Sequence, residues 1–218
     1  MASTKLSGPM LPPVAGGNPG RLVVLLHGYG TNGNDLIGLG MQWRSLLPDA
    51  LFISPDAPEE VPNYPMGRQW FSLDAERPVA RLVGLPAVRP VMEEFLKDLW
   101  SQTGLTARDT LLVGFSQGAM VALHVGLALT EPLMGIVAFS GALVAPENFP
   151  AARTPICLVH GDSDTVVDPQ LSAEAEAVLR AAGFAVHYHV SPDAGHGIAP
   201  DGLAFAEAFI VGVTAEGA

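Results

Sequence analysis

The chain has 218 residues, of which 49% are hydrophobic and 15% are charged, so it is long and apolar enough to bury the core of a globular domain. Its 22 acidic and 11 basic side chains give a formal net charge of -11, which argues against nucleic acid and anionic membrane surfaces as partners. The single cysteine, Cys157, excludes an internal disulfide and a four-cysteine zinc site, and it fits a cytoplasmic location.

Residues 1–20 are expected to form an extended N-terminal segment. Pro9, Pro12 and Pro13 interrupt its apolar stretch, so we expect no signal peptide. The apolar runs farther along are much shorter than the ~20 residues that a membrane-spanning helix needs, and we therefore expect no stable membrane association. No repeat, low-complexity tract or change in composition divides the rest, so residues 21–214 are expected to form a single domain.

From residue 21 onward, short apolar runs alternate with longer helix-like segments. Most of the short runs are unbroken by polar residues, which is typical of strands buried on both faces of a sheet. The alternation predicts the α/β class, with a mostly parallel central sheet and helices on both faces. The predicted strands are 22–26, 51–53, 111–115, 134–139, 156–160 and 184–190, and the predicted helices are 35–47, 88–102, 117–129, 169–182 and 203–213.

A glycine-rich turn, Gly28-Tyr29-Gly30-Thr31-Asn32-Gly33, follows the first of these strands. It matches the G-x-G-x-x-G pattern that binds a dinucleotide, and Asp56 lies at about the spacing of the ribose-binding acid. However, His27 separates the strand from the glycines, and prolines flank Asp56 beyond the end of its strand. A dinucleotide-dependent oxidoreductase is therefore a distant alternative, because such turns also occur wherever the backbone approaches a ligand.

Residues 55–85 are too many for a simple connection between two elements. This segment contains several prolines and an aromatic cluster of Tyr64, Trp70 and Phe71. We expect it to be a loop that shapes the substrate site.

The segment Gly114-Phe115-Ser116-Gln117-Gly118 joins a predicted strand to a predicted helix. This is the G-x-S-x-G pattern in its required context, a sharp turn that exposes the Ser116 hydroxyl and directs the N–H of Gln117 at an incoming carbonyl. The alternative interpretation is a tight turn with a serine that caps the helix.

Two later segments supply the base and the acid that a serine nucleophile needs. His196 lies between glycines after the strand 184–190 and is the candidate base, and Asp164 follows the strand 156–160 and is the candidate orienting carboxylate. The chain order serine, aspartate, histidine at strand ends is that of the α/β-hydrolase fold. Asp162 or Asp168 stays open as the third member, and so does a calcium loop, although the glycine and glutamate of the usual loop are missing.

The remaining histidines have structural interpretations. His27 and His160 each precede a glycine at a strand end, and we expect them to hold loop backbone rather than transfer protons. His124 lies within a predicted helix, where we expect a packed core residue or a surface residue. His187 and His189 share one face of a strand as an exposed stripe.

Four segments together resemble the phospholipase/carboxylesterase family of α/β-hydrolases, which includes acyl-protein thioesterases and bacterial carboxylesterases. The resemblance implies Ser116 as nucleophile, His196 as general base and acid, and Asp164 as the orienting carboxylate. It also implies an oxyanion hole formed by the backbone N–H groups of Tyr29 and Gln117. The four segments are Leu26-His27-Gly28-Tyr29-Gly30, Gly114-Phe115-Ser116-Gln117-Gly118, His160-Gly161-Asp162-Ser163-Asp164-Thr165-Val166-Val167 and Gly195-His196-Gly197.

The same resemblance makes residues 68–73 an aromatic loop beside the acyl pocket. Trp70, Phe71 and Leu73 are therefore candidate substrate contacts, together with Val167. Tyr29 stands where family members often have leucine, which implies a bulkier and more polar pocket rim.

The expected function is a serine carboxylesterase that hydrolyses small esters through an acyl-enzyme intermediate, with no cofactor and no metal. An acyl-protein thioesterase or a lysophospholipase is the main alternative, and a non-catalytic α/β scaffold is another. The family resemblance allows a homodimer.

Overall fold

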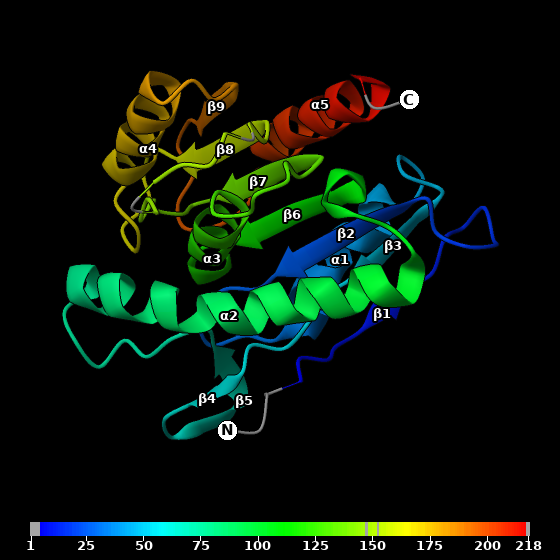
Figure 1. Cartoon of the computed structure of the whole chain (residues 1–218). Helices are drawn as coiled ribbons and strands as arrows, with labels where there is room; N and C mark the ends of the chain where they lie inside the picture. The colour runs from blue at the N-terminus through cyan, green and yellow to red at the C-terminus, as the bar shows by residue number, and fades with distance from the viewer. Residues whose placement is uncertain (1–4, 147, 152, 217–218) are drawn as a thin grey trace.

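The computed structural model describes residues 5–146, 148–151 and 153–216 (Figure 1). Within them, seven strands form one sheet in the order β1-β3-β2-β6-β7-β8-β9. Strand β1 pairs antiparallel with β3 at one edge, and all other neighbours in this sheet pair in parallel. This is the α/β arrangement that the sequence predicts. The strands are β1 (Met10–Leu11), β2 (Arg21–Leu26), β3 (Ala50–Ile53), β6 (Thr110–Phe115), β7 (Gly135–Phe139), β8 (Ile156–Gly161) and β9 (Val186–Ser191).

Helices cover both faces of the sheet because successive side chains of a strand point to opposite faces. Along β2, Leu22 and Val24 belong to one core, and Val23 and Leu25 belong to the other. Helices α2, α3 and α4 pack on the first face, and α1 and α5 pack on the second (Figure 1). The helices are α1 (Gly33–Trp43), α2 (Arg77–Thr103), α3 (Gln117–Gly126), α4 (Gln170–Ala181) and α5 (Pro200–Glu216).

The carboxyl ends of the parallel strands meet at one edge of the sheet, which is where ligands bind in open α/β sheets. The loops that follow β2, β6, β8 and β9 therefore lie close together, although they are far apart in the sequence. In the described part of the chain, no helix combines the length and the apolar composition needed to cross a bilayer.

Residues 55–85 are not a loop throughout, so that prediction was wrong. Strands β4 (Glu59–Val61) and β5 (Tyr64–Gln69) form an antiparallel hairpin, and α2 already begins at Arg77. The expected N-terminal segment also contributes to the sheet, since Met10 and Leu11 form β1; its residues 1–4 lie outside the described residues. The other predicted elements are present, with ends shifted by a few residues.

Helix α2 begins at residue 77 and not at the predicted residue 88 because its prolines do not end it. Pro78 lies in the first turn, where the missing N–H has no intrahelical partner to lose. Pro86 and Pro90 lie inside the helix, but both are exposed. The carbonyl groups that lose a partner therefore face the solvent side, where water can hydrate them.

Candidate active site

Ser116 occupies the sharp turn between β6 and α3, with a φ of 54° that L residues rarely adopt. Its N–H donates to the carbonyl of Phe139 at 2.9 Å, which helps to hold this conformation. Glycine is required at positions 114 and 118 because neighbouring backbone leaves no room for a side chain there. A Cβ atom at Gly114 would lie 2.3 Å from the carbonyl oxygen of Gly118, and one at Gly118 would lie 1.9 Å from that of Leu26.

His196 lies on the loop after β9 and reaches both Ser116 and Asp164. Its Nε2 is 2.9 Å from Ser116 Oγ, and its Nδ1 is 2.7 Å from Asp164 Oδ2. Because a carboxylate only accepts, Nδ1 carries the ring proton and Nε2 is free to accept the hydroxyl proton. The imidazole also packs against Phe115, with ring centroids 4.9 Å apart. The three side chains that the sequence singled out therefore form one connected hydrogen-bond path.

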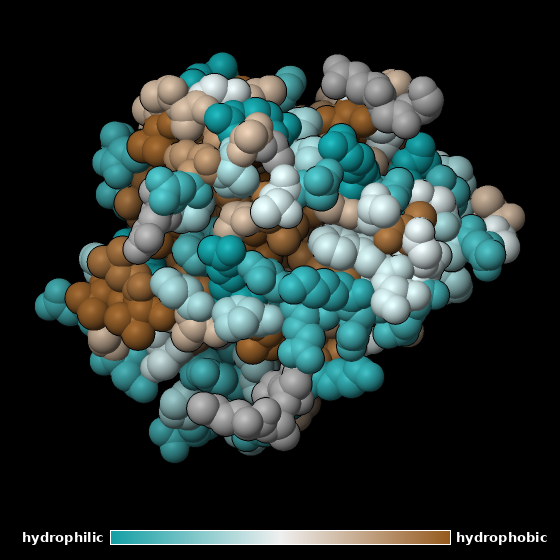
Figure 2. All heavy atoms as spheres, in the orientation of Figure 1, coloured by the Kyte–Doolittle hydropathy of each residue, from teal (hydrophilic) through white to brown (hydrophobic). Residues whose placement is uncertain are grey.

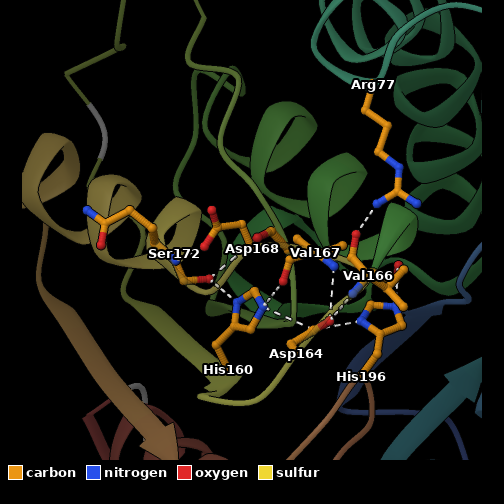
Figure 3. Close-up of polar contacts among 11 residues, drawn as sticks. Arg77, His160, Asp164, Val166, Val167, Asp168, Ser172 and His196 are labelled. Carbon is orange, nitrogen blue, oxygen red and sulfur yellow. Dashed lines mark hydrogen bonds and ion pairs between the residues drawn. The ribbon is translucent and has the colours of Figure 1, made fainter.

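Asp164 is fully enclosed by hydrogen-bond donors (Figure 3). Its Oδ1 accepts the N–H groups of Val166 and Val167 at 2.8 and 3.0 Å, which fixes the carboxylate in the loop after β8. Burial by itself raises the pKa of the Asp164 carboxyl, but the hydrogen bonds from His196, Val167 and Val166 together hold this pKa below its usual value. The carboxylate is thus kept ionised beside the imidazole.

His160 is the second histidine on Asp164. Its Nε2 lies 3.0 Å from the carbonyl of Val167 and 3.2 Å from Asp164 Oδ2, so Nε2 must carry a proton. Its Nδ1 lies 2.6 Å from the hydroxyl of Ser172 on α4. Burial lowers the pKa of His160, which keeps the ring neutral. The expectation that His160 holds loop backbone is confirmed, and its contact with Asp164 was not anticipated.

Trp70 lies behind the site and not in it. Its side chain is 1% exposed, and its Nε1 donates to the carbonyl of His27 at 2.9 Å. The Gln117 side chain clamps the same segment, because its Oε1 accepts the N–H of Trp70 and its Nε2 donates to the carbonyl of Phe71. His27 in turn accepts the N–H of Ala57 at Nε2, so it holds loop backbone as expected. Trp70 as a substrate contact is a prediction that the structure contradicts.

A pocket of about 770 Å³ opens at Ser116. Its lining includes five residues that the sequence gives as candidate oxyanion-hole donors or substrate contacts: Tyr29, Phe71, Leu73, Gln117 and Val167. Gln117 is the first residue of α3, so its backbone N–H has no intrahelical acceptor. The lining also includes residues that the sequence did not single out as pocket residues: Arg77, Pro78, Arg81, Met120, Thr165, Val166 and Leu171.

Comparison with known proteins assigns the chain to a family. A family model described as Phospholipase/Carboxylesterase matches residues 15–213. The chain belongs to the phospholipase/carboxylesterase family. It is similar to the solved structure of esterase PE8, with 50% identity and a TM-score of 0.91 over 96% of this chain and 99% of that one. It is 33% identical to esterase YpfH of Escherichia coli over 85% of this chain and 80% of that protein. Acyl-protein thioesterase 1 of Neurospora crassa is 28% identical, over 96% of this chain and 93% of that protein.

In this member of the phospholipase/carboxylesterase family, the glycine-rich turn after β2 does not form a dinucleotide-binding site. The Asp56 carboxylate accepts the N–H of Gly33 at 2.8 Å, so it caps α1 and is not free for a ribose. A Cβ atom at Gly33 would lie 2.0 Å from the carbonyl oxygen of Ser54, which explains this glycine by packing. The oxidoreductase alternative is therefore wrong.

The loop after β8 was also considered as a calcium site. Asp162 is exposed and accepts the hydroxyl of Ser163, while Asp164 faces His196 and His160. Across the described ranges, no group of three or more His, Cys, Asp or Glu side chains is placed to hold a metal ion. Burial raises the pKa of Cys157 to about 12, as expected for an inert thiol in a strand.

Proposed function

We propose that the chain is a serine carboxylesterase that hydrolyses carboxylic esters through an acyl-enzyme intermediate. The observation that carries this proposal is the continuous path from Asp164 through His196 to Ser116, with steps of 2.7 and 2.9 Å. This path ends at the floor of a largely apolar pocket. Its geometry supports nucleophilic catalysis with a histidine base and an orienting carboxylate.

In the first step, Ser116 Oγ attacks the ester carbonyl carbon while His196 Nε2 takes the hydroxyl proton. The developing imidazolium is stabilised by the Asp164 carboxylate, which stays ionised because of the hydrogen bonds that it accepts from His196, Val166 and Val167. The carbonyl oxygen becomes an oxyanion, and we assign its stabilisation to the backbone N–H groups of Tyr29 and Gln117. The tetrahedral intermediate then collapses, His196 gives its proton to the leaving alkoxide, and the alcohol departs.

In the second step, water replaces the alcohol. His196 takes a proton from the water as its oxygen attacks the acyl carbon, and the same backbone donors stabilise the second oxyanion. Collapse breaks the bond to Ser116 Oγ, which recovers its proton from His196. The carboxylic acid is released and the free enzyme is restored. The reaction needs no group beyond this chain and water.

The direct test is Ser116→Ala, assayed with p-nitrophenyl acetate and by labelling with a fluorophosphonate. We expect kcat to fall by about 10⁴-fold or more and labelling to be lost. Ser101→Ala is the matched control, because Ser101 is exposed on α2 and far from the pocket lining. If Ser116→Ala hydrolyses the ester at the wild-type rate while Ser101→Ala behaves in the same way, Ser116 is not the nucleophile.

A second candidate function is hydrolysis of longer acyl thioesters, as in an acyl-protein thioesterase. One observation favours it: the N-terminal end of α2 carries an exposed apolar cluster of Val79, Leu82 and Val83 (Figure 2). This cluster directly follows Arg77 and Pro78, which line the pocket, and it offers a surface for the distal part of a long chain. Rates for p-nitrophenyl esters and matched thioesters from C2 to C16 separate the candidates. A maximum at C12 or longer supports the second, and a maximum at C2 to C6 supports the first.

A further inference from the structure

Two arginines lie in the wall of the pocket at Ser116, although the chain has only 11 basic residues against 22 acidic ones. Arg77 and Arg81 are four residues apart at the start of α2, so their side chains lie on the same helix face. Two like charges at this spacing destabilise a helix. The pair is therefore costly to the fold unless another group compensates its charge.

Within the described part of the chain, neither Arg77 nor Arg81 forms an ion pair. Arg81 is half-buried, and burial, followed by the nearby charge of Arg77, lowers the pKa of its guanidinium. A partly desolvated guanidinium without an anion is unfavourable. Five other arginines do have carboxylate partners, whereas Arg44 has none among the described residues; the five are Arg21, Arg68, Arg89, Arg108 and Arg180.

Arg77 reaches from α2 across to the loop after β8, where it donates a hydrogen bond to the carbonyl of Val166 (Figure 3). A guanidinium has five N–H donors, so this bond leaves others for a ligand. The nearest carboxylates do not satisfy the pair. Asp164 is engaged by His196. Asp168 lines the same pocket, but it accepts the N–H of Gln170 and forms no ion pair with either arginine within the described residues.

Much of the remaining wall is apolar, with contributions from Phe71, Leu73, Met120 and Leu171. The pocket thus combines a reactive serine, apolar surface and two arginines that form no ion pair within the described residues. We propose that the pocket selects esters that carry a carboxylate at the far end of a short apolar chain, and that Arg81 and Arg77 bind this carboxylate. This inference rests on the proposed esterase function and names its substrate class.

A carboxylate fits this site better than a phosphate. Guanidinium groups bind carboxylates in a bidentate manner, and a carboxylate adds only a single negative charge to the site. A phosphate monoester carries a charge of about -1.5 to -2 at pH 7. Asp164 and Asp168 already contribute carboxylates to the lining, so the larger charge meets more repulsion.

The experiment compares monoethyl adipate, pimelate and suberate with the ethyl esters of the corresponding ω-amides, which have the same length without the charge. We expect the wild-type protein to show a kcat/KM about ten-fold higher for the acids, mainly through a lower KM, at one or more chain lengths. Arg81→Gln is expected to reduce this ratio to near one. Asp168→Asn is expected to raise it, because asparagine removes the opposing charge and can still cap α4.

Arg89→Gln is the matched control, because Arg89 lies on α2 outside the pocket lining and pairs with Glu93. It removes the same charge from the same helix, and we expect both activity and the acid-to-amide ratio to stay at the wild-type level. A wild-type protein that hydrolyses the amide esters without preferring the acids overturns this inference and leaves the esterase function intact. The same conclusion follows if folded Arg81→Gln retains the preference. If no ester of either series is hydrolysed, the esterase function itself fails and this inference fails with it.

Discussion

The side chain of Gln117 holds the segment behind the proposed oxyanion hole, and its removal has a cost that follows from the structure. Its Oε1 accepts the N–H of Trp70 and its Nε2 donates to the carbonyl of Phe71, each at 2.8 Å and each buried. Gln117→Leu keeps a similar volume and the backbone N–H, but it leaves both backbone groups without a partner. Each buried group without a partner costs about 1–3 kcal/mol. Allowing for partial relaxation, we expect the free energy of unfolding to fall by about 2–4 kcal/mol.

Thermal unfolding measures this loss directly. For a chain of this size, 1 kcal/mol corresponds to about 2–4 °C in Tm, so Gln117→Leu is expected to lower Tm by roughly 5–15 °C. Gln42→Leu is the control, because Gln42 is exposed on α1 and the chemical change is the same. We expect this variant to change stability by no more than about 0.5 kcal/mol. Equal Tm values for the two variants would refute the clamp.

Three further outcomes follow from close approach and burial. Gly118→Ala places a Cβ 1.9 Å from the Leu26 carbonyl oxygen and is expected to lower the free energy of unfolding by more than ~3 kcal/mol. Gly38→Ala, in open space on α1, is expected to raise it by up to ~1 kcal/mol. Similar denaturant midpoints for the two variants would contradict this. His160→Leu is expected to lower kcat roughly ten-fold by loosening Asp164, with KM little changed, and a wild-type kcat would exclude that positioning role. Burial lowers the pKa of three histidines, so below a pH of about 6.5 the unfolded chain binds more protons than the folded one. The free energy of unfolding is therefore expected to fall towards pH 5 by up to ~1.4 kcal/mol per pH unit for each histidine. A constant Tm from pH 7.5 to 5 would show that these rings are not held neutral. The three are His27, His124 and His160.

The sheet and the meeting of the three site residues could be predicted from the sequence because both depend on local patterns. Unbroken apolar runs mark parallel strands, and the carboxyl ends of parallel strands share one edge of the sheet. Ser116 and Asp164 each follow such a run, and His196 follows a more polar predicted strand of the same sheet, so topology alone brings the three close. The need for glycine at positions 114 and 118 could also be predicted from the sequence, and the structure gives the reason: a Cβ atom at either position would lie within 2.3 Å of a backbone oxygen.

Helix α2 and its arginines could not be predicted in the same way. Proline normally ends a helix, and the sequence carries no signal that Pro86 and Pro90 lie on the solvent side. Once the helix is assumed to begin at residue 88, Arg77 and Arg81 belong to a loop and their four-residue spacing has no meaning. The placement of these two charges in the pocket wall therefore depends on a helix start at Arg77 that the proline pattern does not reveal.

For Trp70, the sequence pattern predicts that the segment lies beside the pocket but does not predict which way the side chain points. The segment 68–73 does lie beside the pocket, and Phe71 and Leu73 line it, yet Trp70 turns towards the carbonyl of His27. The reason lies in residues distant in sequence, because the Gln117 side chain fixes the backbone on both sides of Trp70 and leaves its indole facing the core. Phe71, Leu73 and the first turns of α2 consequently form this part of the pocket wall, and we expect substitutions there, and not at Trp70, to change substrate preference.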